Sequence, residues 1–287
     1  MMMTINRRDL LKSGALAAAA GIAAPLATAE RALAEVISKP SPIHFGVASY
    51  SFRKFDRARV IEFLKQLKIS SLNVKDMHLP LGNPEETKRA VAEFNAAGVK
   101  LSAAGVIYFN KDEDNDMRAK FEYCKLAGVN LIVAGPTRQT LPRVEKFARE
   151  YDMRIAIHNH GPEDPEFPSP LDAWKAVQSM DRRMGLCIDV GHAARAGADV
   201  PEAIRLCAPR LYDVHMKDLA DMKVRESQVE VGDGHMPVRR IFESLIAVHY
   251  EGFVDLEYEI HEDDPLPGMS RSFAYMRGVV AGMGFDA

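Results

Sequence analysis

The chain has 287 residues, with 37 lysines and arginines against 40 aspartates and glutamates, so its formal net charge is −3. This length is enough for one large domain with a sizeable core. The near balance of charge argues against a nucleic-acid-binding or membrane-binding surface. The three cysteines fit neither a disulfide framework nor a CxxC metal site, and Cys187 is predicted to be a small core residue.

Residues 1–35 are predicted to be a cleaved targeting signal that lies outside the fold. Arg7 and Arg8 begin the run Arg-Arg-Asp-Leu-Leu-Lys, and an alanine-rich apolar stretch follows. This segment resembles a twin-arginine secretion signal, and its apolar run is too short for a membrane-spanning helix. The alternative is a chance arginine pair before a helix. The resemblance implies export of the folded protein to the periplasm.

Beyond a proline-containing linker, short apolar runs alternate with amphipathic segments. The apolar runs predict strands over residues 44–52, 71–76, 99–107, 130–135, 153–161, 185–192, 211–217 and 253–259. The amphipathic segments predict helices over residues 57–67, 84–97, 117–126, 141–150, 170–180, 200–207, 237–248 and 269–283. A longer polar loop, residues 218–234, follows the seventh strand.

Eight strand–helix units in about 240 residues have the size and rhythm of a (β/α)8 barrel. The predicted fold class is therefore α/β, with a single TIM barrel over residues 42–284 and no second domain. The alternative is an open, doubly wound sheet, which would be expected to carry a glycine-rich loop after its first strand. Residues 49–55 (SYSFRKF) are not such a loop.

Four of the predicted strands end on side chains that suit a metal ion. His158, Asp189, His215 and Glu257 each take the last inward position of a strand, where side chains alternate between faces. Active sites of such barrels lie at the carboxyl ends of the strands. Any one of the four alone could equally be a core histidine or a salt-bridge partner, but a set of unpaired buried charges would be costly. Two imidazoles and two carboxylates suit one divalent ion: Mn²⁺, Zn²⁺, Fe²⁺, Co²⁺ or Mg²⁺.

The motifs IDVGH, VHMKD and GFVDLE resemble those of the xylose isomerase-like barrel superfamily, in the branch of sugar phosphate isomerases/epimerases and ketose 3-epimerases. The resemblance covers residues 42–284. It implies that Asp189, His215 and Glu257 hold a divalent metal and that His192 contacts a substrate oxygen.

The chain departs from this family at one ligand. Where the family has a glutamate in a pattern like ENH, this chain has His158-Asn159-His160. In the family that glutamate is both a ligand and one of two acid/base groups. A neutral imidazole can still bind a metal, but the first of the paired bases is then missing.

The expected catalytic residues are Glu257, His192 and Lys217. Glu257 is a ligand or base, and Lys217 lies two residues beyond His215 on the same face of its strand. Three weaker candidates for contacting substrate or moving a proton are His160, Lys75 and His78. Two acidic residues, Asp213 and Asp255, are predicted to face the barrel interior one layer below the ligands and to orient them.

Three classes of function fit these residues. The first is a divalent-metal-dependent isomerase or epimerase acting on a sugar or keto-sugar through an enediolate-like intermediate, or a lyase or hydratase acting on 3-keto-glycosides. The second is a non-catalytic, exported sugar-binding barrel. The third is a nuclease-like protein, which the acidic balance disfavours. The expected partner is therefore a small-molecule sugar, with no nucleic-acid partner and no membrane partner after signal cleavage; a homo-oligomer is left open.

Overall fold

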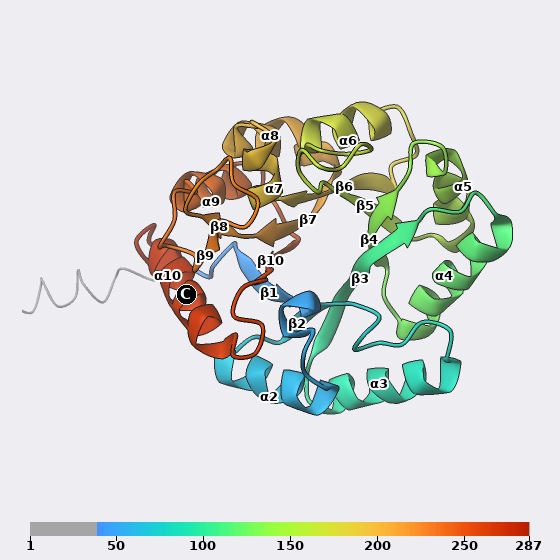
Figure 1. Cartoon of the computed structure of the whole chain (residues 1–287), viewed down its shortest axis with the longest axis horizontal. Coiled ribbons are helices and arrows are strands. Elements are labelled where there is room, and N and C mark those ends of the chain that lie inside the picture. Colours follow the sequence, from blue (N-terminus) through green and yellow to red (C-terminus); the bar gives the residue numbers. More distant parts are fainter. Residues whose placement is uncertain (1–38, 287) are drawn as a thin grey trace, which may run out of the picture. The chain divides into compact units, whose positions relative to one another are not determined.

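A computed structural model describes residues 39–286, and the predicted twin-arginine signal over residues 1–35 lies outside them. Eight parallel strands close into one barrel in the order β1-β10-β7-β6-β5-β4-β3-β2 (Figure 1). The predicted α/β class and single TIM barrel are confirmed, and the doubly wound alternative is excluded because the sheet has no open edge. No helix within residues 39–286 is both long enough and apolar enough to span a membrane.

The barrel strands are short, and helices surround them (Figure 1). The strands are β1 (His44–Ala48), β2 (Ser71–Val74), β3 (Lys100–Phe109), β4 (Leu131–Pro136), β5 (Arg154–His158), β6 (Met184–Asp189), β7 (Leu211–Met216) and β10 (Phe253–Leu256). The helices are α2 (Arg57–Leu67), α3 (Pro84–Ala96), α4 (Asp114–Ala127), α5 (Leu141–Tyr151), α6 (Pro170–Val177), α7 (Val190–Arg195), α8 (Val200–Cys207), α9 (Val238–Ala247) and α10 (Leu266–Ala281). Two 3-10 turns, η1 (Ser49–Phe52) and η2 (Ala208–Arg210), and the antiparallel pair β8 (Asp218–Leu219) and β9 (Gln228–Val229) complete the described elements.

Side-chain caps explain why several helices begin where the sequence predicts. Asp56 accepts the N–H of Arg59 at 2.9 Å before α2, and Asn83 accepts the N–H of Glu86 at 3.2 Å before α3. Such caps satisfy amide groups that have no partner within the helix. Pro84 then occupies the first turn of α3, where its missing N–H costs nothing.

Several predicted strands extend past their observed ends: the first, fifth and eighth were expected to reach residues 52, 161 and 259, but β1, β5 and β10 end at Ala48, His158 and Leu256. The sixth strand was expected to reach His192, but β6 ends at Asp189 and α7 begins at Val190. The reason is a cap: Asp189 Oδ1 accepts the N–H of His192 at 2.8 Å. His192 therefore projects from a short helix at the barrel mouth, and the Asp189 carboxylate keeps one oxygen, Oδ2, for another partner.

The barrel interior has an apolar half and a polar half. Strands β3 to β6 contribute the cluster Ala103, Leu131, Val133, Ala156 and Cys187, which confirms the predicted core position of Cys187. Strands β1, β2, β7 and β10 contribute Gly46, Ser71, Asn73, Asp213, His215 and Asp255. As predicted, both acidic residues are buried below the strand ends. TIM-barrel interiors are usually filled by bulky branched side chains, so the polar half is built for something other than packing alone.

Candidate metal centre

Four side chains from neighbouring strand ends meet at the carboxyl end of the barrel. His158 and Asp189 end β5 and β6, His215 lies in β7, and Glu257 directly follows β10. One nitrogen or oxygen from each lies within 4.8 Å of those of the other three, and all four residues are buried. The structure thus brings together the four residues that the sequence nominates as metal ligands.

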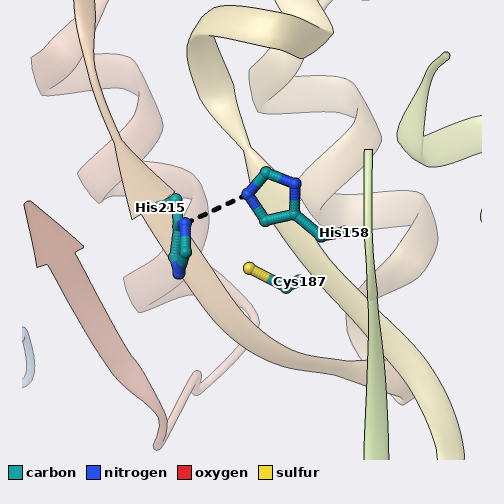
Figure 2. Close-up of side chains that lie close together, drawn as sticks. All are labelled: His158, Cys187 and His215. Carbon is teal, nitrogen blue, oxygen red and sulfur yellow. Dashed lines mark hydrogen bonds between the residues drawn. The ribbon is translucent and has the colours of Figure 1, made fainter. Parts of the chain in front are cut away.

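The distances define which atoms face the common point. His158 Nε2 lies 3.0 Å from His215 Nδ1, and Figure 2 shows these two rings pointing toward each other. His158 Nε2 is also 3.7 Å from Asp189 Oδ2. On the other side, His215 Nδ1 is 3.2 Å from Glu257 Oε2. Two ring nitrogens and two carboxylate oxygens therefore converge.

Cys187 also lies near the two histidines, which makes it a competing ligand (Figure 2). Its surroundings argue against that role. The side chain is buried among the apolar residues of β3 to β5, and this burial raises the pKa of the thiol far above its usual value. Because the thiolate is the metal-binding form, the carboxylate of Asp189 is the better ligand from the same strand.

Lys217 places an ammonium group between the two buried carboxylates, Asp189 and Glu257. Its Nζ lies 3.2 Å from Asp189 Oδ2 and 3.0 Å from Glu257 Oε2, and it also pairs with Glu259. Burial alone would lower the pKa of Lys217, but these carboxylates raise it well above its usual value. Burial would raise the pKa of Glu257, but Lys217 and His215 hold it well below its usual value. Lys217 is therefore an ammonium and Glu257 a carboxylate.

The two histidines differ in charge. Burial, together with the neighbouring His160 and His215, holds the pKa of His158 well below its usual value, so His158 is neutral. Burial alone would also lower the pKa of His215, but its contacts with Cys187 and with the Glu257 carboxylate raise it well above its usual value. A metal ion binding here displaces a proton from His215.

These four residues fit a divalent metal ion. Asp189 Oδ2 is buried and accepts no hydrogen bond within residues 39–286, but it lies 3.2 Å from the Lys217 ammonium. Because buried carboxylates are costly without a nearby positive charge, a divalent ion here would add to the charge that Lys217 provides. Two imidazole nitrogens and two carboxylate oxygens form a donor set of intermediate softness, suited to zinc, manganese, iron or cobalt, with magnesium as the hardest candidate.

The other predicted site residues divide between a pocket and structural roles. Lys217, His192 and His160 line a pocket of about 460 Å³ beside the cluster. Lys75 donates to the carbonyl of Val106 at 3.2 Å and does not line this pocket. His78 does not reach it either: the ring is buried, with Nε2 3.1 Å from the carbonyl oxygen of Phe55, and burial lowers its pKa. His78 is therefore a packing residue.

Three residues near the pocket were missed by the sequence analysis. Glu259 pairs with Lys217, and the alternation of acidic residues at 255, 257 and 259 could have identified it. Arg195 lies three residues after His192 on α7 and pairs with Glu163. Gln228 on β9 donates to the carbonyl of Glu257 at 2.7 Å and accepts the N–H of Glu259 at 3.0 Å, a role that nothing in the sequence indicates.

Comparison with known proteins gives the same picture of the fold. The model of the family described as xylose isomerase-like TIM barrel matches residues 48–279. An inosose dehydratase of Mesomycoplasma hyopneumoniae strain 7448 is 22% identical over 162 residues, which cover 50% of this chain and 53% of that protein. The chain therefore spans about half the length of the curated relatives it matches.

Two solved structures illustrate the range of similar barrels. The 3-keto-D-glucoside 4-epimerase YcjR of E. coli, in its apo form, is 17% identical, covers 82% of this chain and 99% of its own, and has a TM-score of 0.66. The IOLI protein with a bound zinc atom is 18% identical, covers 84% of this chain and 99% of its own, and also has a TM-score of 0.66. At such identities the likeness concerns the fold alone.

Proposed function

The chain belongs to the xylose isomerase-like TIM barrel family, and on that premise we propose that it is a divalent-metal-dependent enzyme acting on an uncharged keto-sugar. The observation that carries the proposal is the buried cluster of His158, Asp189, His215 and Glu257 beside a pocket of about 460 Å³. The curated dehydratases and the solved epimerase support the same class of substrate, a sugar-like ketone.

The four clustered residues would hold the ion. When bound, a divalent metal supplies Lewis-acid polarisation of a carbonyl oxygen, which acidifies the neighbouring C–H bond. The protein's own residues then handle the protons. Glu257 is ionised and would accept a proton, and Lys217 is an ammonium and would donate one.

This pair of groups favours elimination or hydration over two-base epimerisation. In elimination, Glu257 takes the proton from the carbon next to the ketone, and the electron pair of that C–H bond forms the C=C bond. The neighbouring C–O bond breaks, and the departing hydroxyl leaves as water with the proton of Lys217. Epimerisation needs an acid/base group on each face of the carbon, and His158 stands where members of the family have the glutamate that is the first of these two groups. Isomerase or epimerase chemistry remains the second candidate because of the epimerase among similar structures.

The charges in the pocket favour a substrate without a phosphate. Arg195 pairs with Glu163 and Lys217 with Glu259, so these cations already have carboxylate partners. His192 is a neutral imidazole because burial lowers its pKa, and it suits a hydroxyl group as hydrogen-bond partner. A polyhydroxylated, uncharged ring matches this lining.

We also propose that the enzyme works in the periplasm. The proposal rests on the arginine pair at residues 7 and 8 and on the alanine-rich stretch that follows. A periplasmic location agrees with a substrate that carries no phosphate.

The test combines metal content with proton exchange. Protein stripped with EDTA is reconstituted with Zn²⁺, Mn²⁺, Co²⁺ or Mg²⁺, and 3-keto-glycosides, inososes and ketoses are followed by NMR in D₂O. We expect one metal per chain and metal-dependent loss of the C–H signal next to the ketone, with dehydrated or hydrated product. A wild-type protein that binds no divalent ion at this cluster, or that binds sugar without exchange or turnover, contradicts the proposal and favours a non-catalytic barrel.

A further inference from the structure

Glu257 lies just beyond the end of β10, where the barrel sheet stops. The two strands beside β10 end at Ala48 and Met216, so neither continues alongside the residues that follow Leu256. The N–H of Glu257 still reaches the carbonyl of Met216 at 3.1 Å. Its own carbonyl, and the N–H groups of the next two residues, have no strand of the described barrel beside them. Because Glu257 is buried, the main chain here needs other hydrogen-bond partners.

A side chain from a loop supplies two of these partners. Gln228 lies on β9, in the loop between β7 and α9. Its Nε2 donates to the carbonyl of Glu257 at 2.7 Å, and its Oε1 accepts the N–H of Glu259 at 3.0 Å. The main chain fixes which end of the amide lies where, because a carbonyl can only accept and an N–H can only donate. Gln228 therefore pairs with this segment as a neighbouring strand would.

Ser51 holds the same segment from the other side. This residue of η1 is wholly buried, and its Oγ accepts the N–H of Tyr258 at 2.9 Å. The segment that carries Glu257 is thus held on one flank by the turn after β1 and on the other by the loop after β7. Because its main chain is held on both flanks, the carboxylate of Glu257 has only its own side-chain torsions left to vary.

The loop that carries Gln228 is itself fixed at its base. The buried carboxylate of Asp218, at the start of the loop, accepts three main-chain N–H groups from the far end. These belong to Gly232, Gly234 and Met236, at 2.8, 3.3 and 2.9 Å. Next to these bonds, β8 and β9 pair as antiparallel strands. Gln228 therefore extends from a rigid support, which accurate placement of a functional group requires.

We propose that Gln228 is a positioning residue for the metal centre: by pairing with the main chain on both sides of Tyr258, it holds the carboxylate of Glu257 in place. The inference rests on the proposed function, in which Glu257 would hold the metal and take the proton. It gives the loop between β7 and α9 a part in building the centre, although the loop supplies none of the four ligands. Gln228 also lines the pocket, so a direct contact with substrate is the competing explanation.

The test uses two substitutions of Gln228 and a control on the adjacent residue. Gln228→Met keeps the length of the side chain but makes neither hydrogen bond. Gln228→Asn keeps the amide but is one methylene shorter, so it is too short to bridge the two main-chain groups. Ser227→Ala is the control, because within residues 39–286 the Ser227 hydroxyl donates only to carbonyls of its own loop, those of Asp221 and Val224. The measurements are amide exchange of Glu259 in metal-free protein, calorimetric affinity for Zn²⁺ and Mn²⁺, and kcat and KM on keto-sugars.

In both Gln228 variants the amide of Glu259 should exchange about 2–10-fold faster than in wild type, as the loss of one hydrogen bond implies. Metal affinity and kcat should each fall about 10–100-fold, the usual effect of removing a group that orients a ligand, while KM changes less. Ser227→Ala should match wild type throughout. Wild-type kcat and metal affinity in folded Gln228→Met would overturn the inference. Full activity of Gln228→Asn, or a rise in KM alone, would also overturn it, because either result indicates a substrate contact rather than positioning.

Two outcomes separate this inference from the proposed function. If wild type binds no divalent ion, the proposed function fails and the inference fails with it. If wild type binds metal and turns over a keto-sugar, but both Gln228 variants do so equally well, only the inference fails. Should Gln228→Met not fold, Gln228→Asn decides the matter by the same measurements.

Discussion

Replacing Lys217 by methionine tests the charge balance of the centre. The ammonium of Lys217 lies 3.2 Å from Asp189 Oδ2 and 3.0 Å from Glu257 Oε2, and the residue is only 3% exposed. Methionine keeps most of the length and volume of the side chain but removes the charge. In metal-free protein, two buried carboxylates then lose their shared cation.

The magnitude follows from these distances. At an effective dielectric constant of about 20, a charge pair near 3 Å is worth about 5 kcal/mol. Much of the gain from two such pairs is offset by the cost, several kcal/mol per ion, of removing charges from water. Breaking a buried pair by removing one partner costs about 3–5 kcal/mol. For a domain of this size we expect metal-free Lys217→Met to melt roughly 6–15 °C below wild type.

A divalent ion should reverse most of this loss, because it replaces the missing positive charge. The assay is thermal unfolding with EDTA and with saturating Mn²⁺ or Zn²⁺, using Lys65→Met, an exposed position on α2, as control. The gain in Tm on adding metal should be larger for Lys217→Met than for wild type, and turnover should be lost in both states. Wild-type stability of the metal-free variant, or a gain from metal no larger than that of wild type, would refute the reasoning.

Four further outcomes are expected. His158→Ala should contain less than one metal ion per chain and lose turnover; if it binds metal fully and as tightly as wild type, His158 is not a ligand. His158→Glu should favour Mg²⁺ and Mn²⁺, because hard ions prefer oxygen ligands. Gly46→Ala should destabilise the protein by about 1–3 kcal/mol, because its Cβ would lie 1.9 Å from Asp255 Oδ1, and adding Asp255→Ala should recover most of that loss in urea unfolding. At pH 8 the folded protein should react negligibly with a disulfide reagent, because all three cysteines are buried and burial raises the pKa of Cys207 to about 12. Unfolded protein should show three reactive thiols. Lysines in place of Arg7 and Arg8 should leave the precursor in the cytoplasm on cell fractionation, and normal periplasmic delivery would show that the signal is misread.

The sequence predicts the metal centre well where the alternation of side chains along a strand is enough to place a residue. His158, Asp189, His215 and Glu257 each end an inward-facing series on a strand, and parallel strands in a barrel end at the same mouth. Nothing about their final positions depends on the course of a loop. Their convergence could therefore be expected without coordinates.

The sequence predicts less where the position of a side chain depends on a second element or on a local irregularity of the strand. The cap formed by Asp189 was readable in principle, but the apolar run that continues to Val190 favoured a longer strand. Asn73 could be assigned to the inward face, yet β2 and β3 shift register between Leu72 and Asn73, so its contact with His215 could not be predicted. Gln228 reaches Glu257 through the path of a loop, which alternation and helical periodicity do not describe.

The division of the barrel interior has a consequence for how the site is assembled. The apolar half comes from β3 to β6, which are consecutive in the chain, whereas β1 and β2 come from its beginning and β7 and β10 from its end. The ligands straddle this boundary: His158 and Asp189 belong to one half-barrel, His215 and Glu257 to the other. A chain divided between β6 and β7 thus yields two fragments with two ligands each. In such a split protein, a metal ion bound by all four ligands links the two fragments. Reassembly of the fragments therefore measures metal binding.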